Sequence, residues 1–166
     1  LEGIGLLNEA KMCFEEILEK NPNLYQIHCN LGTVLMYQNR LAEAIQSFSK
    51  TIELNSDFAL GYNNLAVTFT RQGEIELAKE YYLKTLQLDP NYGSGQSNYL
   101  FHLQYLPGLT PHFLFSEHCR WNKWVQTQVA SRYTYDLDVP ESNRPLRIGY
   151  LSPNFDDHSA VPLLKM

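Results

Sequence analysis

The sequence predicts a mainly α fold: an array of helical hairpins of about 34 residues each, followed near the end of the chain by the first strand of a second domain. One helical pattern occurs twice, and such self-similarity at a fixed period is the signature of stacked repeats. Its copies are His28-x-x-Leu31-Gly32-x-x-Leu35 and Tyr62-x-x-Leu65-Ala66-x-x-Phe69. Residues 146–152 instead alternate apolar and polar side chains, which is typical of a strand.

Each copy is followed by a second helical pattern, in which an alanine precedes an aromatic residue by four positions. These second helices contain Ala44-x-x-x-Phe48 and Ala78-x-x-x-Tyr82, and the latter closes on Pro90. The whole arrangement is the tetratricopeptide pattern. Gly32 and Ala66 are small where paired helices meet, and we expect Ala44 and Ala78 to face them from the second helices.

Turn-forming residues separate the predicted helices. Asn39-Arg40 and Gly73-Glu74 mark the turns inside the two hairpins. Pro22 and Pro90 each follow a second helix, because proline cannot continue the hydrogen-bond ladder of a helix. The sequence therefore predicts two complete hairpins between Pro22 and Pro90.

Both ends of the array depart from the repeat. Residues 6–20 read as a second helix without its first helix, so its apolar face should seek another partner. After residue 92 we expect a helix at 94–105, then a break with Thr110 as N-cap, and a long helix from Phe113 to about Arg132. The predicted domains are the repeats at 1–92, a divergent final repeat and transition helix at 93–132, a linker at 133–145 and the start of a second, α/β domain at 146–166.

Composition narrows the classes of partner. The net charge is −5 and no run of basic residues is present, so we expect no binding to nucleic acid. No apolar stretch is long enough to cross a membrane. The three cysteines form no metal-ligand spacing, so we expect no metal site and a cytoplasmic protein with reduced thiols. The chain starts at Leu1 and stops at Met166 inside helical patterns, and we expect it to be a fragment of a longer protein, with oligomers possible.

Three asparagines recur with the period of the helical pattern. Asn30, Asn64 and Asn98 each occupy the sixth position of a predicted first helix. A carboxamide offers one acceptor and two donors, so it can pair with both groups of a peptide bond. A row of them would bind an extended polypeptide by its backbone. In the alternative interpretation these amides cap or bridge neighbouring helices.

The segment after the linker carries a more specific resemblance. Arg144-Pro-Leu-Arg-Ile-Gly-Tyr-Leu-Ser-Pro-Asn-Phe-Asp-Asp-His-Ser159 resembles the opening of the catalytic region in protein O-linked N-acetylglucosamine (O-GlcNAc) transferases and in Spindly-type protein O-fucosyltransferases. The blocks 98–105 and 115–121 resemble the bacterial members of this family. The resemblance thus extends from the repeats to the first catalytic strand.

The resemblance implies a catalytic domain of the two-domain glycosyltransferase type (GT-B-like). It implies that His158 accepts the proton of the acceptor hydroxyl, although by its spacing alone His158 would read as an exposed loop histidine. Asn30, Asn64 and Asn98 match the family's acceptor-peptide track. The donor would be UDP-GlcNAc in preference to GDP-fucose, and the fragment itself, which lacks the donor-binding second half, is expected to hold no cofactor and to be inactive.

Two functions follow from these patterns. In the first, this chain is the acceptor-protein-binding part of a protein O-glycosyltransferase that moves a sugar from a nucleotide sugar to Ser or Thr. In the second, it is a non-catalytic tetratricopeptide scaffold for protein–protein interaction. The two differ in whether His158→Ala abolishes transfer in the intact protein.

Overall fold

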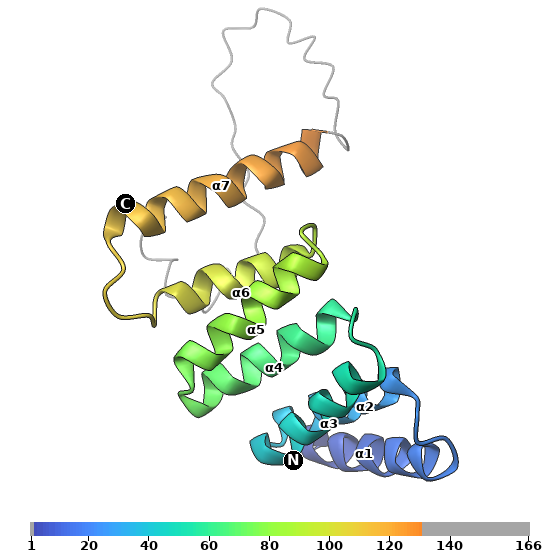
Figure 1. Ribbon diagram of the computed structural model, residues 1–166. Helices are drawn as coiled ribbons and strands as arrows, with labels where there is room; N and C mark the ends of the chain where they lie inside the picture. The colour runs from blue at the N-terminus through green and yellow to red at the C-terminus, as the bar shows by residue number, and fades with distance from the viewer. Residues whose placement is uncertain (1, 131–166) are drawn as a thin grey trace, which may run out of the picture. The chain divides into compact units, whose positions relative to one another are not determined.

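The computed structural model of this chain describes residues 2–130, which form helices joined by short turns (Figure 1). The helices are α1 (Glu2–Lys20), α2 (Tyr25–Tyr37), α3 (Leu41–Leu54), α4 (Ala59–Gln72), α5 (Ile75–Leu88), α6 (Gly93–Leu103) and α7 (Pro111–Ala130). No strand occurs between residues 2 and 130. The predicted linker, the predicted strand at 146–152 and His158 lie outside the described residues.

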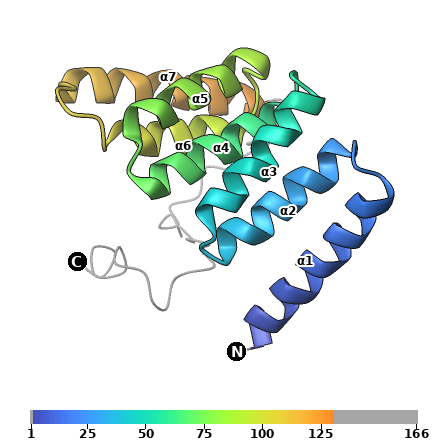
Figure 2. The same cartoon turned by 60° about the horizontal axis from the view of Figure 1, so that its bottom comes forward.

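The helices pair and stack in chain order. α2 packs on α3 and α4 packs on α5 as hairpins, while α3 contacts α4 and α5 contacts α6 between hairpins (Figures 1 and 2). The first helices of the two hairpins begin at Tyr25 and Ala59, and the second helices begin at Leu41 and Ile75, so both pairs are offset by the same interval. The predicted repeat of helical hairpins is confirmed.

The turns inside the two hairpins have the same backbone geometry. Asn39 has φ 61° and Gly73 has φ 83°, so both adopt the left-handed conformation that ends a helix. The next residue then donates back into the helix, from Arg40 N–H to the Leu35 carbonyl at 2.9 Å and from Glu74 N–H to the Phe69 carbonyl at 3.0 Å. These bonds satisfy carbonyls that the helix end would leave unpaired.

Gly32 is small because of an aromatic ring on the partner helix. The sequence had suggested Ala44 as the neighbour of Gly32. A Cβ at Gly32 would instead lie 2.6–2.9 Å from ring atoms of Phe48, so Phe48 is the closest neighbour. Ala44, Ala66 and Ala78 are all fully buried in the same helix contacts. The ring of Phe48, one helical turn beyond Ala44, fills the space that glycine leaves.

A second close contact, between hairpins, was not foreseen from the sequence. A Cβ at Gly61 would lie 3.2 Å from the Thr51 methyl carbon, and one at Gly95 would lie 3.0 Å from the Thr85 methyl carbon. Both threonines are fully buried, and each hydroxyl donates to the carbonyl four residues earlier in its own helix. The same small pair therefore joins α3 to α4 and α5 to α6.

The two ends of the helical stack differ from the complete hairpins. α1 inserts Phe14 and Leu18 against the core around α2 but leaves Leu6 and Met12 exposed. α6 ends two residues earlier than the predicted helix, ahead of a break that contains Gly108 at φ 77°. α7 begins at Pro111, and the Phe113 N–H donates to the Thr110 hydroxyl at 3.2 Å, which confirms the predicted N-cap.

Candidate functional site

The three predicted asparagines occupy equivalent places on three neighbouring helices. Asn30, Asn64 and Asn98 are the sixth residues of α2, α4 and α6. α4 contacts both α2 and α6 directly, so the three helices lie next to one another. Asn30 is exposed, whereas Asn64 and Asn98 are half-buried. The name asparagine row is used below for these three residues.

Two members of the asparagine row belong to a chain of side-chain hydrogen bonds that crosses all three helices. Asn98 Nδ2 donates to Asn63 Oδ1 at 3.1 Å, Asn63 Nδ2 donates to Asn64 Oδ1 at 3.4 Å, and Asn64 Nδ2 donates to Cys29 Sγ at 3.5 Å. Asn63 and Cys29 are buried, with 4% and 2% of their surface exposed. Asn64 and Asn98 thus also bridge neighbouring helices.

The amides keep hydrogen-bonding capacity that this chain does not use. The Asn30 side chain has no hydrogen bond within residues 2–130, and Asn98 uses its side-chain amide nitrogen while its Oδ1 accepts nothing there. The two side-chain bonds of Asn64 are long, and its acceptor on Cys29 is a sulfur, which is a weak acceptor. A peptide N–H or C=O can therefore pair with each of the three side chains.

The Cys29 thiol is a structural group at the end of this chain of bonds. Burial raises the pKa of Cys29 to about 11, and the hydrogen bond from Asn64 acts in the opposite direction. A thiol with this pKa stays protonated and unreactive at neutral pH. The Cys29 thiol therefore serves as a neutral hydrogen-bond acceptor for Asn64 and not as a nucleophile.

A second row of side chains follows the asparagine row. Tyr37, Arg71 and Tyr105 each follow an asparagine of the row by seven residues. Within α2 and α4 this spacing is two helical turns, or about 10 Å along the axis, and places Tyr37 and Arg71 on the side of Asn30 and Asn64. Tyr105 lies in the turn after α6. Tyr37 and Tyr105 are 63% and 51% exposed. The Arg71 guanidinium donates to the Met36 carbonyl at 3.2 Å and is itself exposed. Aromatic faces and a cation beside the amides can contact side chains of a bound segment.

Sequence reasoning found the asparagine row but missed its buried connections. Asn63 could have been noticed, because two adjacent asparagines in a helix interior are unusual. Cys29 gave no signal, since its contact with Asn64 joins residues of different repeats. The second row was missed because its members differ in residue type, so only their shared position relates them.

Two other kinds of site are absent from the part of the chain that the structure describes. No group of three or more His, Cys, Asp or Glu side chains there is placed to hold a metal ion. No described helix is long and apolar enough to cross a membrane. His158, the predicted catalytic residue, falls outside this part.

Comparison with known proteins agrees with the repeat geometry. The family model described as tetratricopeptide repeat matches residues 25–58 and 59–92. No curated protein sequence matches the chain significantly. The similarity to known proteins therefore rests on the repeat pattern and on the fold.

Several solved structures share the stacked helical hairpins. A crystal structure of MamA protein superposes with a TM-score of 0.68 at 19% identity, covering 81% of this chain and 72% of that one. The O-GlcNAc transferase of Thermobaculum terrenum, in a mutant form, gives 0.69 at 17% identity, covering 73% of this chain but only 23% of its own length. The first TPR of Spaghetti, bound to an HSP90 peptide, gives 0.57 at 20% identity, covering 60% and 79%.

At identities of this size the likeness concerns the fold alone. The family model and the structure agree on the boundaries, because each matched segment begins with the first helix of a hairpin, α2 or α4, and ends just before the next one. Helices α2 to α5, with the turns that follow them, are therefore two tetratricopeptide repeats, and this part of the chain belongs to a class of fold that serves protein–protein interaction.

Proposed function

We propose that this chain binds an extended polypeptide segment and that the asparagine row holds the backbone of that segment. The observation that carries the proposal is the equal placement of Asn30, Asn64 and Asn98 on three adjacent helices, each with unused or weakly used hydrogen-bonding atoms. Carboxamides match the donor and acceptor of a peptide bond. Sequence preference would come from the second row of Tyr37, Arg71 and Tyr105.

The alternative interpretation, in which the amides only bridge helices, makes a different prediction for Asn30. Asn64 and Asn98 take part in the bonds between helices, but Asn30 takes part in none of those that the structure describes. Asn30→Ala should therefore not lower the unfolding free energy under either interpretation, and should raise it by at most about 0.7 kcal/mol through helix propensity. Only if the row binds a peptide should Asn30→Ala weaken the affinity for that peptide.

The test uses an unstructured peptide selected on this chain from a display library, with affinity measured by fluorescence polarisation. We expect Asn30→Ala to weaken binding about fivefold, the effect of one neutral hydrogen bond, with no loss of stability in urea unfolding. Asn122→Ala, an exposed asparagine of α7, is the matched control and should bind like wild type. N-methylation of the peptide backbone should abolish binding.

Two results would contradict peptide binding by the row. One is a selected peptide whose affinity is unaffected by Asn30→Ala and by backbone N-methylation. The other is the failure of repeated selections to yield any peptide that binds.

We further propose that the intact protein is a protein O-glycosyltransferase and that this chain contains its acceptor-binding arm. The likeness of residues 144–159 to the catalytic opening of O-GlcNAc and O-fucosyl transferases supports this. So does the fold likeness to the Thermobaculum terrenum O-GlcNAc transferase. In this proposal His158 accepts the proton from the acceptor hydroxyl as the sugar is transferred, and UDP-GlcNAc is the donor in preference to GDP-fucose.

The experiment incubates the intact protein with labelled UDP-GlcNAc or GDP-fucose and a mixture of acceptor proteins. We expect incorporation from UDP-GlcNAc, its loss in His158→Ala, and unchanged peptide affinity in that variant. Absence of incorporation from either donor would leave the scaffold function, in which the repeats bind a partner without modifying it. The Asn30→Ala binding test is independent of this experiment, because the proposal of peptide binding can be correct even if the proposal of sugar transfer is wrong.

A further inference from the structure

A pocket of about 300 Å³ lies among α5, α6 and α7. Its aromatic, apolar and charged walls include Tyr99, Leu100, Glu117, Arg120, Trp121 and Trp124. None of the three asparagines lines it. The name tryptophan pocket is used for this cavity.

Two features fix the wall that Trp124 forms. The indole Nε1 of Trp124 donates to Asn91 Oδ1 at 3.0 Å. A Cβ at Gly93 would lie 3.2 Å from the same indole ring, so glycine at the start of α6 lets the ring lie directly against the helix. Tyr99 and Leu100 are 7% and 6% exposed and belong to the core. The pocket is thus built from anchored side chains.

The pocket contains a carboxylate with little access to water. The Glu117 side chain is only 14% exposed, and Glu117 Oε2 pairs with Arg120 at 2.6 Å. Arg120 is 72% exposed, so this pair is held by a side chain that water and salt compete for. The other carboxylate oxygen has no hydrogen bond within residues 2–130. A largely buried carboxylate among aromatic rings favours a cation beside it.

One residue of the pocket wall, Trp121, has a donor without an acceptor. The indole Nε1 of Trp121 is buried, and nothing in the described part of the chain accepts its hydrogen. A buried donor left unpaired is costly. Because this nitrogen is covered, a bound peptide would supply the missing acceptor through a backbone carbonyl as its entry turns the indole toward the pocket. A free amine lacks such a carbonyl.

We propose that the tryptophan pocket binds the side chain of a lysine or arginine presented by a polypeptide partner. The cation would lie against the faces of the aromatic rings and beside the Glu117 carboxylate. The carbonyl of the same residue would accept from Trp121. This site is distinct from the asparagine row, because it binds one charged side chain of the partner, whereas the row binds the backbone of the partner.

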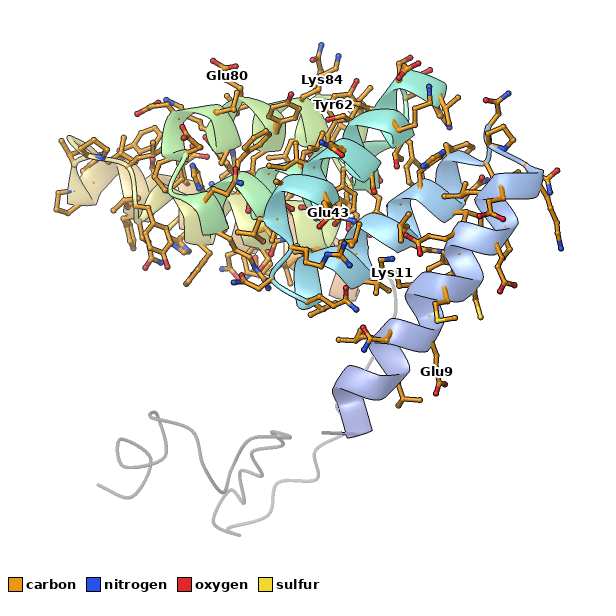
Figure 3. All side chains as sticks on the ribbon, turned by 90° about the horizontal axis from the view of Figure 1, so that it is seen from below. Glu9, Lys11, Glu43, Tyr62, Glu80 and Lys84 are labelled. Carbon is orange, nitrogen blue, oxygen red and sulfur yellow. The ribbon has the colours of Figure 1, made fainter. Side chains whose placement is uncertain are left out.

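A second hollow on the molecule shows why charge matters to this choice. A cavity of about 280 Å³ between α4 and α5 is lined by Tyr62, Glu80 and Lys84 among others (Figure 3). Both hollows are lined by one acid and one base, but Glu80 is exposed to water. The Glu117 side chain is 14% exposed, so only the tryptophan pocket holds a poorly solvated carboxylate.

Tryptophan fluorescence reports the pocket directly, because the chain has only two tryptophans and both line it. The probes are Nα-acetyl-lysine methylamide, its arginine and norleucine counterparts, and butylammonium. We expect a saturable emission change with the lysine and arginine probes. Binding of the norleucine probe, which has no charge, and of butylammonium, which has no carbonyl, should be at least about tenfold weaker.

Substitutions at the ion pair should change binding in opposite directions. Glu117→Gln removes the charge and keeps the shape, and should weaken the lysine probe at least about tenfold. Arg120→Gln removes the competing cation and should strengthen it about threefold. Glu53→Gln, a carboxylate of α3 that is 66% exposed and also paired, should change nothing.

Three outcomes would overturn the proposal. Equal binding of the norleucine and lysine probes would make the pocket an apolar one. No saturable fluorescence change with either cationic probe would mean that it takes no such side chain. Unchanged or weaker binding in Arg120→Gln would remove the role of the carboxylate, even if Glu117→Gln failed to fold.

Discussion

At Gly32 the two helices of the first complete repeat approach until a single methyl group no longer fits. The Phe48 ring lies 2.6–2.9 Å from where a Cβ would be, and Phe48 is itself fully buried. Gly5 offers the reverse situation. It also lies in a helix, α1, but nothing comes within 4 Å of its Cβ position.

These two glycines give a paired prediction for alanine substitution. Gly32→Ala should lower the unfolding free energy by about 1–3 kcal/mol through overpacking. Gly5→Ala should raise it by about 0.5–1 kcal/mol, because alanine loses less backbone entropy in a helix. Urea unfolding followed by circular dichroism measures both. Changes of the same sign in the two variants would show that helix propensity, and not the contact with Phe48, decides the effect.

At the scale of elements, α6 is attached to the preceding repeat partly through a buried histidine. His102 is fully buried, its Nδ1 lies 3.1 Å from the Thr70 hydroxyl of α4, and its ring centroid is 5.1 Å from that of Tyr82 in α5. Burial lowers the pKa of His102 below its ordinary 6.5. The Ile75 backbone and Glu76 act in the opposite direction without offsetting burial, and Lys79 adds to the lowering.

The lowered pKa predicts acid sensitivity of the helical stack. The unfolded chain takes up the histidine proton near pH 6.5 while the folded chain resists it, so the stabilisation is complete above that pH and is lost as pH falls through the lower folded pKa. Unfolding free energies of wild type should therefore decline as the pH falls below about 6.5. His102→Asn should flatten this decline, whatever its effect at pH 7.5. The exposed His112 provides the control, His112→Asn, and an identical slope in His102→Asn would refute the assignment.

The residues at which helices begin and end were predicted from the local sequence more accurately than the side chains that pack between helices. Residues with special backbone geometry, Asn39 and Gly73, ended α2 and α4 where the sequence predicted turns. Thr110 and Pro111 likewise set the start of α7. Capping and left-handed turns depend on a few consecutive residues, so the printed sequence contains the information. The first helix begins at Glu2, earlier than the predicted residue 6, because no helix-breaking proline stands between these positions.

On the scale of the whole described unit, stability comes from contacts between neighbouring hairpins. The Thr51–Gly61 contact recurs one repeat later as Thr85–Gly95, and each helix packs chiefly on those beside it in the chain. Molecules of this kind behave as nearly one-dimensional arrays, in which a unit can be removed if the junction is preserved. Joining residue 58 to residue 93 would place Gly95 ten residues after Thr51, as Gly61 is now.

Deletion of residues 59–92 should therefore leave a folded helical protein. We expect helical ellipticity per residue close to wild type, with a lower unfolding free energy and a lower urea m-value, since less surface is exposed on unfolding. Deletion of residues 59–74, which removes α4 alone, breaks the register and should abolish cooperative unfolding. If both deletions unfold the protein equally, the hairpins are not interchangeable units.

The sequence by itself determined the period of the repeat, the turns at Asn39 and Gly73, and the equivalent positions of Asn30, Asn64 and Asn98. These features arise from spacing along one chain and from local backbone preferences. Only the tertiary structure decided that Phe48 fills the space at Gly32, that Asn63 joins two members of the asparagine row, and that Glu117 lies in an aromatic pocket. Each of these depends on which side chains from separate helices meet, and packing between helices, rather than periodicity within them, settles that.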